Sequence, residues 1–369
     1  MAVTGRDARL DVFRGMALVT ILIDHVPGNI YSQWTLGNWG WSDAAEGFVL
    51  MSGVSAGLAY GTHFRFPMRF WTGLAKVLRR TWVLYLTHIL ITVCGMAATA
   101  AIAGWFANSE LLNANQIDGV LRHPISALRG IPLLTYQLDY GDILPMYLVL
   151  IGVSPLLLIC AWRKPGLLLA GSVLVWLLAS VFDLNLPSLT RPNGWFFNPL
   201  AWQLVFVVGL LTGVAIKDGR RLVPVRGWLQ VISALVLLVG FTWNHWPLVG
   251  QPLHGLVSFL GRDGWPDYLI GFEKTLLPLP RLLHAFALFY LLSSFRGLSH
   301  WCRTVWLAPF AMLGRDALPV FALSSIFVFG MQAVVNQTGN DPWRDTTMLA
   351  FTIAICLGLT GARFFWPKD

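Results

Sequence analysis

The sequence has 369 residues, of which 56% are hydrophobic and only 12% are charged, and its mean hydropathy is +0.62. This composition excludes an ordinary soluble domain. The net charge of +8 does not indicate nucleic-acid binding, because the basic residues stand in short clusters between apolar runs, as they do in membrane proteins.

Ten apolar runs are long enough to be membrane-crossing helices, since about 20 apolar residues span the hydrocarbon and the backbone there must satisfy its own hydrogen bonds. They cover roughly 10–30, 44–62, 81–106, 142–161, 166–183, 198–216, 227–244, 279–295, 305–335 and 346–362. The first part of the ninth run is also compatible with an interfacial helix. No internal repeat is apparent, so the sequence predicts an all-α bundle that forms one integral-membrane domain over residues 1–369.

Basic residues are distributed unevenly between the two sides of this bundle. With the N-terminus inside, 19 of the 26 basic residues lie on the inner side and 13 of the 18 acidic residues lie on the outer side. The inner basic residues are Arg6, Arg9, Arg14, Arg65, Arg69, Lys76, Arg79, Arg80, Arg163, Lys164, Lys217, Arg220, Arg221, Arg226, Arg296, Arg303, Arg315, Arg363 and Lys368. The positive-inside rule therefore predicts that both termini are cytoplasmic.

The first apolar run carries two polar residues in a regular relation. Arg14 and His25 are eleven residues apart, so on a helix they share one face and are separated by about 16 Å along the axis. An imidazole is a natural general base near neutral pH, and ionisable residues inside a membrane are functional candidates. Alternatively, Arg14 reaches lipid phosphates and pairs with Asp11, while His25 only ends the helix.

The second run opens with Ser42, Asp43 and Glu46. Either carboxylate could orient the imidazole of His25 and stabilise its protonated form. The same spacing is also that of a capping box, in which both carboxylates favour the start of the helix. The sequence leaves these two interpretations open.

Within the second run, residues 53–57 match the G-x-S-x-G pattern of a hydrolase nucleophile. That chemistry needs a strand and a sharp turn, whereas the surroundings here predict a continuous helix. Gly53, Gly57 and Gly61 instead predict close helix packing. The eight histidines show no HExxH motif and the four cysteines no ligand spacing, so no metal site is expected.

Several tryptophans, among them Trp39 and Trp41, fall on the outer side. Most of this pattern is typical of the aromatic belt at a membrane interface. Ring faces near His25 would also bury the apolar face of a sugar, which would indicate a carbohydrate acceptor.

The spacing from Arg14 to His25 resembles the R-x10-H motif of the acyltransferase-three superfamily. Further blocks resemble its OpgC family, which succinylates osmoregulated periplasmic glucans in bacteria. These blocks begin at Arg6, Ile23, Ser42, Asp142, Phe197, Glu273 and Gly314 and reach residue 321.

The resemblance implies a multi-pass protein of the inner membrane, with a cytoplasmic acyl-CoA donor and a periplasmic glucan acceptor. It implies that His25 is catalytic, that Arg14 is its motif partner, and that Asp43 and Glu46 line the site. It also implies that Asn198, Trp202 and Gln203 line the site, with weaker support for Glu273 and Arg315.

These inferences combine into one hypothesis. His25 deprotonates an acceptor hydroxyl, which attacks the thioester of a succinyl-CoA, and Asp43 or Glu46 holds the imidazole. Donor phosphates are expected at Arg14, Arg65, Arg69, Arg79 and Arg80, because guanidinium groups suit phosphate oxygens. The acceptor is expected at Ser42, Trp39, Trp41, Asn198, Trp202, Gln203 and Glu273. No permanently bound cofactor is expected, and the partners are acyl-CoA, a glycan and the lipid bilayer.

Three alternatives remain at this point: transfer of acetyl or another acyl group to a different surface glycan, a polyprenyl-phosphate donor, and a transporter or flippase. A transporter is less favoured because no paired halves with matching broken helices are visible.

The predicted topology can be tested with fusion reporters. A reporter fused after Asp369 should read cytoplasmic, and one inserted near Asn193 should read periplasmic. The predicted cytoplasmic termini place Arg14 near the inner boundary and His25 in the outer part of the membrane, and a periplasmic C-terminus would contradict this placement.

Overall fold

The computed structural model describes residues 7–295 and 297–365, and over these ranges it contains helices and connecting segments but no strand. Arg6, Arg296 and Lys368, which were counted among the inner basic residues, lie outside the described residues. The all-helical fold class predicted from the sequence is confirmed.

Each of the ten apolar runs forms a helix. The principal helices are α1 (Ala8–Asp24), α3 (Ala44–Tyr60), α4 (Phe70–Trp105), α7 (Ile143–Arg163), α8 (Pro165–Val181), α9 (Pro199–Lys217), α10 (Gly227–His245), α13 (Leu279–Ser294), α16 (Ala317–Thr338) and α17 (Pro342–Phe365). The connecting elements are η1 (Ser32–Trp34), α2 (Leu36–Trp39), η2 (Gly61–His63), η3 (Ser109–Gln116), α5 (Asp118–Arg122), α6 (Pro124–Gly130), α11 (Pro247–Arg262), α12 (Asp267–Ile270), α14 (Leu298–Trp301), η4 (Val305–Leu307) and α15 (Ala308–Arg315).

Six helices of the described chain are long and apolar enough to cross a membrane, namely α4, α7, α9, α10, α16 and α17. The other four principal helices have 16 or 17 residues. Because a perpendicular crossing needs about 20 residues, the count of ten crossings stays a prediction. The ninth apolar run is divided at Asp316 into a short α15 and a long α16.

Glycines bring two helices of the interior into backbone contact. A Cβ atom at Gly53 or Gly57 of α3 would collide with the carbonyl oxygen of Phe206 or Leu210 of α9. Positions advance together along these two helices, so α3 and α9 run parallel. The small-residue ridge predicted from the sequence is therefore a packing surface.

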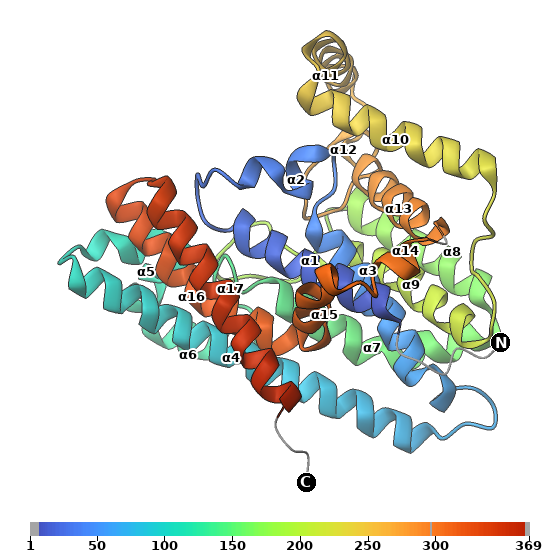
Figure 1. Cartoon of the computed structure of the whole chain (residues 1–369), viewed down its shortest axis with the longest axis horizontal. Coiled ribbons are helices and arrows are strands. Elements are labelled where there is room, and N and C mark those ends of the chain that lie inside the picture. The colour runs from blue at the N-terminus through green and yellow to red at the C-terminus, as the bar shows by residue number, and fades with distance from the viewer. Residues whose placement is uncertain (1–6, 296, 366–369) are drawn as a thin grey trace.

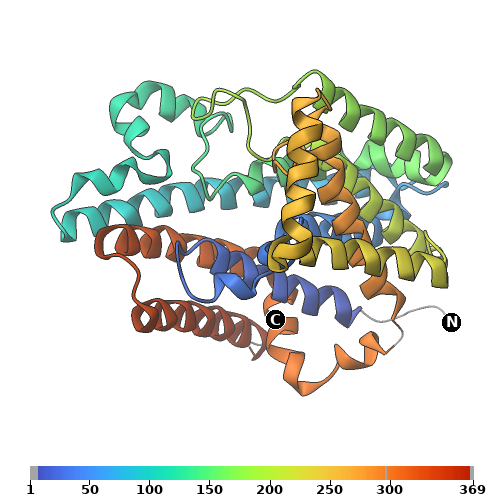
Figure 2. The same cartoon turned by 90° about the horizontal axis from the view of Figure 1, so that it is seen from above.

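The first helix is held in the same way on another side. Gly15 of α1 lies against the backbone of Phe310, and Gly314 lies against the backbone of Asp11, so α15 crosses α1 at a distance that only glycine allows. Figure 1 shows α1 and α3 in the middle of the molecule, and α10 and α11 at its rim. In both views α4 and α16 run side by side along one edge (Figures 1 and 2). The ends of α1 and α3 are thus presented to one another inside the bundle.

Candidate functional site

His25 is the C-cap of α1 and is oriented by its own helix. Its ring nitrogen Nδ1 lies 2.7 Å from the carbonyl oxygen of Ile21. A carbonyl oxygen can only accept, so Nδ1 carries the proton and Nε2 keeps its lone pair. The side-chain amide of Gln332 in α16 donates to the carbonyl oxygen of His25 at 2.8 Å. His25 is therefore fixed in the tautomer that makes Nε2 a proton acceptor.

A tyrosine that the sequence did not single out packs on this imidazole. The ring centroids of His25 and Tyr140 are 4.2 Å apart, and the Tyr140 ring stacks in turn on Phe321 at 6.3 Å. Tyr140 lies two residues before the block beginning at Asp142, in a segment with no periodic signal. Its contact with His25 depends on how the loop before α7 packs against the end of α1, which the local sequence does not show.

Asp43 and Glu46 form the capping box that their spacing predicted. The Asp43 carboxylate accepts from the amide of Ala45 at 2.8 Å, and the Glu46 carboxylate accepts from the amide of Asp43 at 2.9 Å. Both carboxylates also have cationic partners from a distant part of the chain. Lys274 Nζ lies 2.6 Å from Asp43, and Arg281 Nε donates to Glu46 at 2.8 Å.

These four charged side chains, Asp43, Glu46, Lys274 and Arg281, are called here the charge cluster. Arg281 bridges it, because its Nη2 also contacts Asp43 at 3.2 Å. Burial acts against ionisation of Asp43, which precedes the first residue of α3, but Lys274 and Arg281 outweigh burial and hold the pKa of Asp43 below its ordinary value. The cluster thus keeps its charges by balancing them internally.

The charge cluster stands beside His25 without bonding to it. The expected contact between His25 and Asp43 or Glu46 is replaced by the contact of Nδ1 with Ile21, which the local helix geometry supplies. Lys274 and Asp43 nevertheless lie within electrostatic range of His25, and Lys274 also acts on Asp142. Lys274 is therefore the cation of the charge cluster that acts electrostatically on this imidazole.

Arg14 lies at the other end of α1 and opens onto a cavity. Its Nη2 donates to the carbonyl oxygen of Met51 at 3.2 Å and to the hydroxyl of Ser55, the serine of the G-x-S-x-G pattern. The cavity has a volume of about 510 Å³ and reaches α3, α4, α7, α16 and the turn between α15 and α16. Four arginines line it: Arg14, Arg80, Arg315 and Arg363.

This cavity contains only part of the expected donor set. Arg80 lines it together with Arg14, whereas Arg65, Arg69 and Arg79 do not. Arg363 belongs to no sequence motif, and Arg315 was predicted only as part of the block that begins at Gly314. They reach the cavity because α15 and α17 fold back against α1.

Aromatic side chains join the cavity to His25. Phe48, Tyr147 and Phe321 line the cavity, and Phe321 is also the residue that stacks on Tyr140. Since Tyr140 packs directly on His25, two rings in succession connect the arginine-lined cavity with the imidazole.

The outer tryptophans form a cluster with rings from α10 and from the segment before α13. Trp41 packs on Trp243 and Phe272 at 5.9 and 5.7 Å, and the partly exposed Trp39 packs on Phe241. Ser42 is buried, and its hydroxyl lies 2.7 Å from Nδ1 of His284. Ser42 therefore helps to hold α13 against the start of α3.

The remaining expected acceptor residues make internal contacts. Asn198 caps α9 by accepting from the amide of Leu200, and Gln203 bonds to Ser172 of α8. Glu273 accepts from the amide of Thr275. The buried Trp202 donates from its indole nitrogen to the carbonyl oxygen of Lys274 at 3.1 Å, and this contact places Lys274 in the charge cluster.

The chain also matches a known protein family. The family model described as OpgC protein matches residues 6–366, which is nearly the whole chain. The chain belongs to the OpgC family. No curated protein matches it. OpgC membership supports the general class of a membrane acyltransferase that modifies glucans.

The balance of the charge cluster gives a prediction for stability. Arg281→Met leaves the fully buried Glu46 carboxylate without its guanidinium, so we expect a loss of about 3–5 kcal/mol. Adding Glu46→Gln should restore part of this loss, because Asp43 still has Lys274. The measurement is the thermal unfolding midpoint in detergent of the wild type, both single variants and the double variant. Additive effects of the two changes would contradict the ion pair.

Proposed function

We propose that this OpgC-family chain transfers a short acyl group, most simply succinyl, from cytoplasmic acyl-CoA to a hydroxyl group of a periplasmic glucan, with His25 as general base. The observation that carries the proposal is the arginine-lined cavity whose aromatic wall leads through Phe321 and Tyr140 to His25. The arginines of the cavity suit an anionic donor, and the imidazole of His25 at the end of the aromatic wall suits acyl transfer.

The donor is assigned to the arginine-lined cavity. A guanidinium group can donate two parallel hydrogen bonds to the oxygens of a phosphate, and four guanidinium groups line this single cavity. The distance along α1 from Arg14 to His25 is about 16 Å, so the donor must be long if its phosphates remain at the arginines. A pantetheine arm has this extended form and would place the thioester near the aromatic wall.

The acceptor is assigned to the opposite end of the bundle. The aromatic cluster around Trp41 and the partly exposed Trp39 offer ring faces against which a sugar can stack. This surface belongs to the same segment, residues 39–46, that supplies the two carboxylates of the charge cluster. The acceptor hydroxyl would then approach His25 from the side opposite to the donor.

The reaction balances with the groups present. Nε2 of His25 takes the hydroxyl proton while the hydroxyl oxygen forms a bond to the thioester carbonyl carbon. The carbon–sulfur bond then breaks, and the thiolate of CoA leaves with the proton that His25 returns. Lys274, which lies within electrostatic range of His25, would attract the free carboxylate of a succinyl group. Asp43 and Glu46 act as positioning residues, because they hold Lys274 and Arg281.

Removal of the base should abolish transfer without affecting insertion. We expect His25→Ala to lower the rate of CoA release in proteoliposomes supplied with acyl-CoA and glucan by about 10²–10⁴-fold. The exposed His300 offers a matched control, and His300→Ala should retain the wild-type rate. A carrier would release no CoA in either protein, and an active His25→Ala variant would remove His25 from the mechanism.

The product identifies the acyl group. Cells with the active protein should contain periplasmic glucan that binds to an anion exchanger and loses this charge in mild alkali. Cells with His25→Ala should lack it. Neutral acetyl esters would keep the acyltransferase and contradict succinyl transfer, whereas a modified lipid or surface polysaccharide would contradict the glucan acceptor.

A change at the donor cavity should act on donor binding alone. Arg80→Gln removes one guanidinium, so we expect the KM for acyl-CoA to rise about tenfold with little change in kcat, because a charged hydrogen bond contributes about 1.5–3 kcal/mol. Lys76→Gln, one turn earlier on α4 and outside the cavity, is the matched control. Equal KM values for the two variants would show that Arg80 does not bind the donor.

A further inference from the structure

The acyl transfer proposed for this chain, on which the present inference rests, needs a hydrogen-bond donor beside His25. When the acceptor oxygen bonds to the thioester carbonyl carbon, an electron pair moves to the carbonyl oxygen, which becomes an oxyanion. Donors that are fixed in advance around such an oxygen often make the largest contribution to the rate. His25 cannot be this donor, because its Nδ1 is bonded to Ile21 and its Nε2 takes the acceptor proton.

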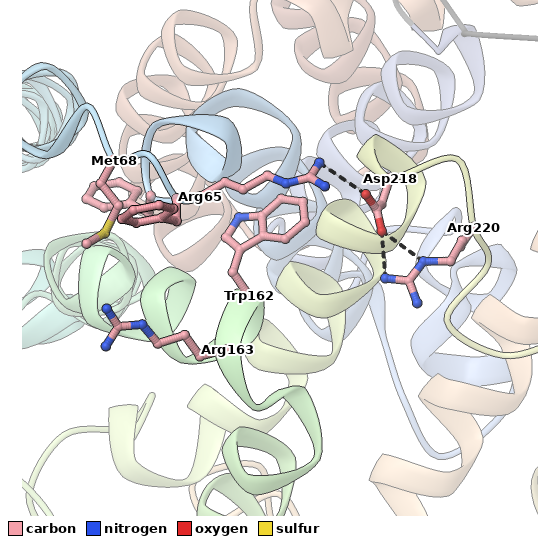
Figure 3. A pocket seen from close by; sticks show the side chains of 8 residues that line it. Arg65, Met68, Trp162, Arg163, Asp218 and Arg220 are labelled. Atoms are coloured by element: carbon pink, nitrogen blue, oxygen red, sulfur yellow. Dashed lines mark hydrogen bonds and ion pairs between the residues drawn. The ribbon is translucent and has the colours of Figure 1, made fainter.

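Four cations outside the donor cavity are already engaged with carboxylates. Both cations of the charge cluster bind its two carboxylates. Arg65 and Arg220 bind Asp218 at 3.2 and 2.7 Å, at a separate cavity of about 350 Å³ that Phe66 also lines (Figure 3). Each of these cations therefore has a carboxylate to neutralise before it can serve a substrate oxygen.

The hydroxyl group of Tyr140, in contrast, has no hydrogen-bond partner. Tyr140 is only 4% exposed, and no group in the described part of the chain bonds to its hydroxyl oxygen. Ser325 of α16 lies near this hydroxyl, but Ser325 donates to the carbonyl oxygen of Phe321 at 2.6 Å. An unsatisfied hydroxyl in an apolar interior is costly, so we expect it to bond to a group that a ligand supplies.

Tyr140 also stands between the donor cavity and the base. Its ring lies 4.2 Å from the ring of His25 and 6.3 Å from that of Phe321, which lines the donor cavity. A thioester that reaches His25 along this aromatic wall passes the Tyr140 ring. Burial raises the pKa of Tyr140 above its ordinary value, so the hydroxyl keeps its proton and remains a donor.

We propose that Tyr140 is a further catalytic residue, whose hydroxyl donates a hydrogen bond to the thioester carbonyl oxygen during acyl transfer. As the acceptor oxygen bonds to the carbonyl carbon, Tyr140 stabilises the charge on the carbonyl oxygen without releasing its own proton. When the carbon–sulfur bond breaks, the electron pair re-forms the carbonyl group and the thiolate of CoA leaves. His25 is thus the proton acceptor of the reaction, and Tyr140 is the donor to its oxyanion.

The test is Tyr140→Phe in the purified full-length chain, assayed in proteoliposomes with succinyl-CoA and periplasmic glucan. Phenylalanine keeps both ring contacts and removes only the hydroxyl. We expect kcat for CoA release to fall about 10²–10³-fold with little change in the KM for succinyl-CoA, because an oxyanion donor acts on the transition state. The thermal unfolding midpoint should stay the same or rise, since an unpartnered buried hydroxyl is removed.

Two controls separate catalysis from structure. Tyr136→Phe removes the hydroxyl of a second buried tyrosine in the same segment, one that donates to the carbonyl oxygen of Gln116, so we expect a lower midpoint and an unchanged kcat. Ser325→Ala should also leave kcat unchanged. Equal losses of kcat in Ser325→Ala and Tyr140→Phe would show a structural hydrogen bond between the two residues and overturn the proposal, as would a lower midpoint for Tyr140→Phe.

The same assay distinguishes this role of Tyr140 from the proposed function. A wild-type chain that releases no CoA, or a His25→Ala variant as active as the wild type, would overturn both. An active wild type and an inactive His25→Ala variant, together with wild-type kcat in Tyr140→Phe, would overturn the role of Tyr140 alone.

Discussion

Charged groups buried in a membrane protein must be neutralised by their neighbours, and this requirement organises the site. Asp43 and Glu46 begin α3 inside the bundle, where two uncompensated carboxylates would be strongly destabilising. Lys274 and Arg281 meet them from the segment before α13 and from α13 itself. This pairing joins parts of the chain that are more than 200 residues apart. Trp202 completes it by holding the backbone of Lys274.

The same arrangement leaves His25 available for chemistry. If Asp43 or Glu46 bonded to the imidazole, the imidazole would compete with Lys274 and Arg281 for that carboxylate. The carbonyl oxygen of Ile21 instead fixes the tautomer of His25 without carrying a charge. The imidazole of His25 is thus oriented by the end of α1, and Asp43 and Lys274 of the charge cluster lie within electrostatic range of it. Division of these two roles explains why the carboxylates and the histidine lie close together without a hydrogen bond.

Two groups of arginines illustrate how similar sequence features acquire different surroundings. Arg14 and Arg80 face a cavity whose aromatic wall leads toward His25. Arg65 and Arg220 are instead bound to Asp218 at a cavity with an exposed apolar rim. Both groups belong to the basic side predicted from the sequence, so charge alone does not distinguish them. The side chains next to each guanidinium distinguish the two cavities.

The sequence by itself determined the features that depend on local interactions. Apolar length predicted the helices, the Asp43 and Glu46 spacing predicted the capping box, and glycine spacing predicted the ridge of α3. Tertiary structure alone decided which cations meet the carboxylates, that Tyr140 packs on His25, and that Arg363 reaches the cavity around Arg14. Helix formation and capping are settled within a few residues, whereas ion pairs and ring contacts join segments whose approach is fixed only when the helices pack.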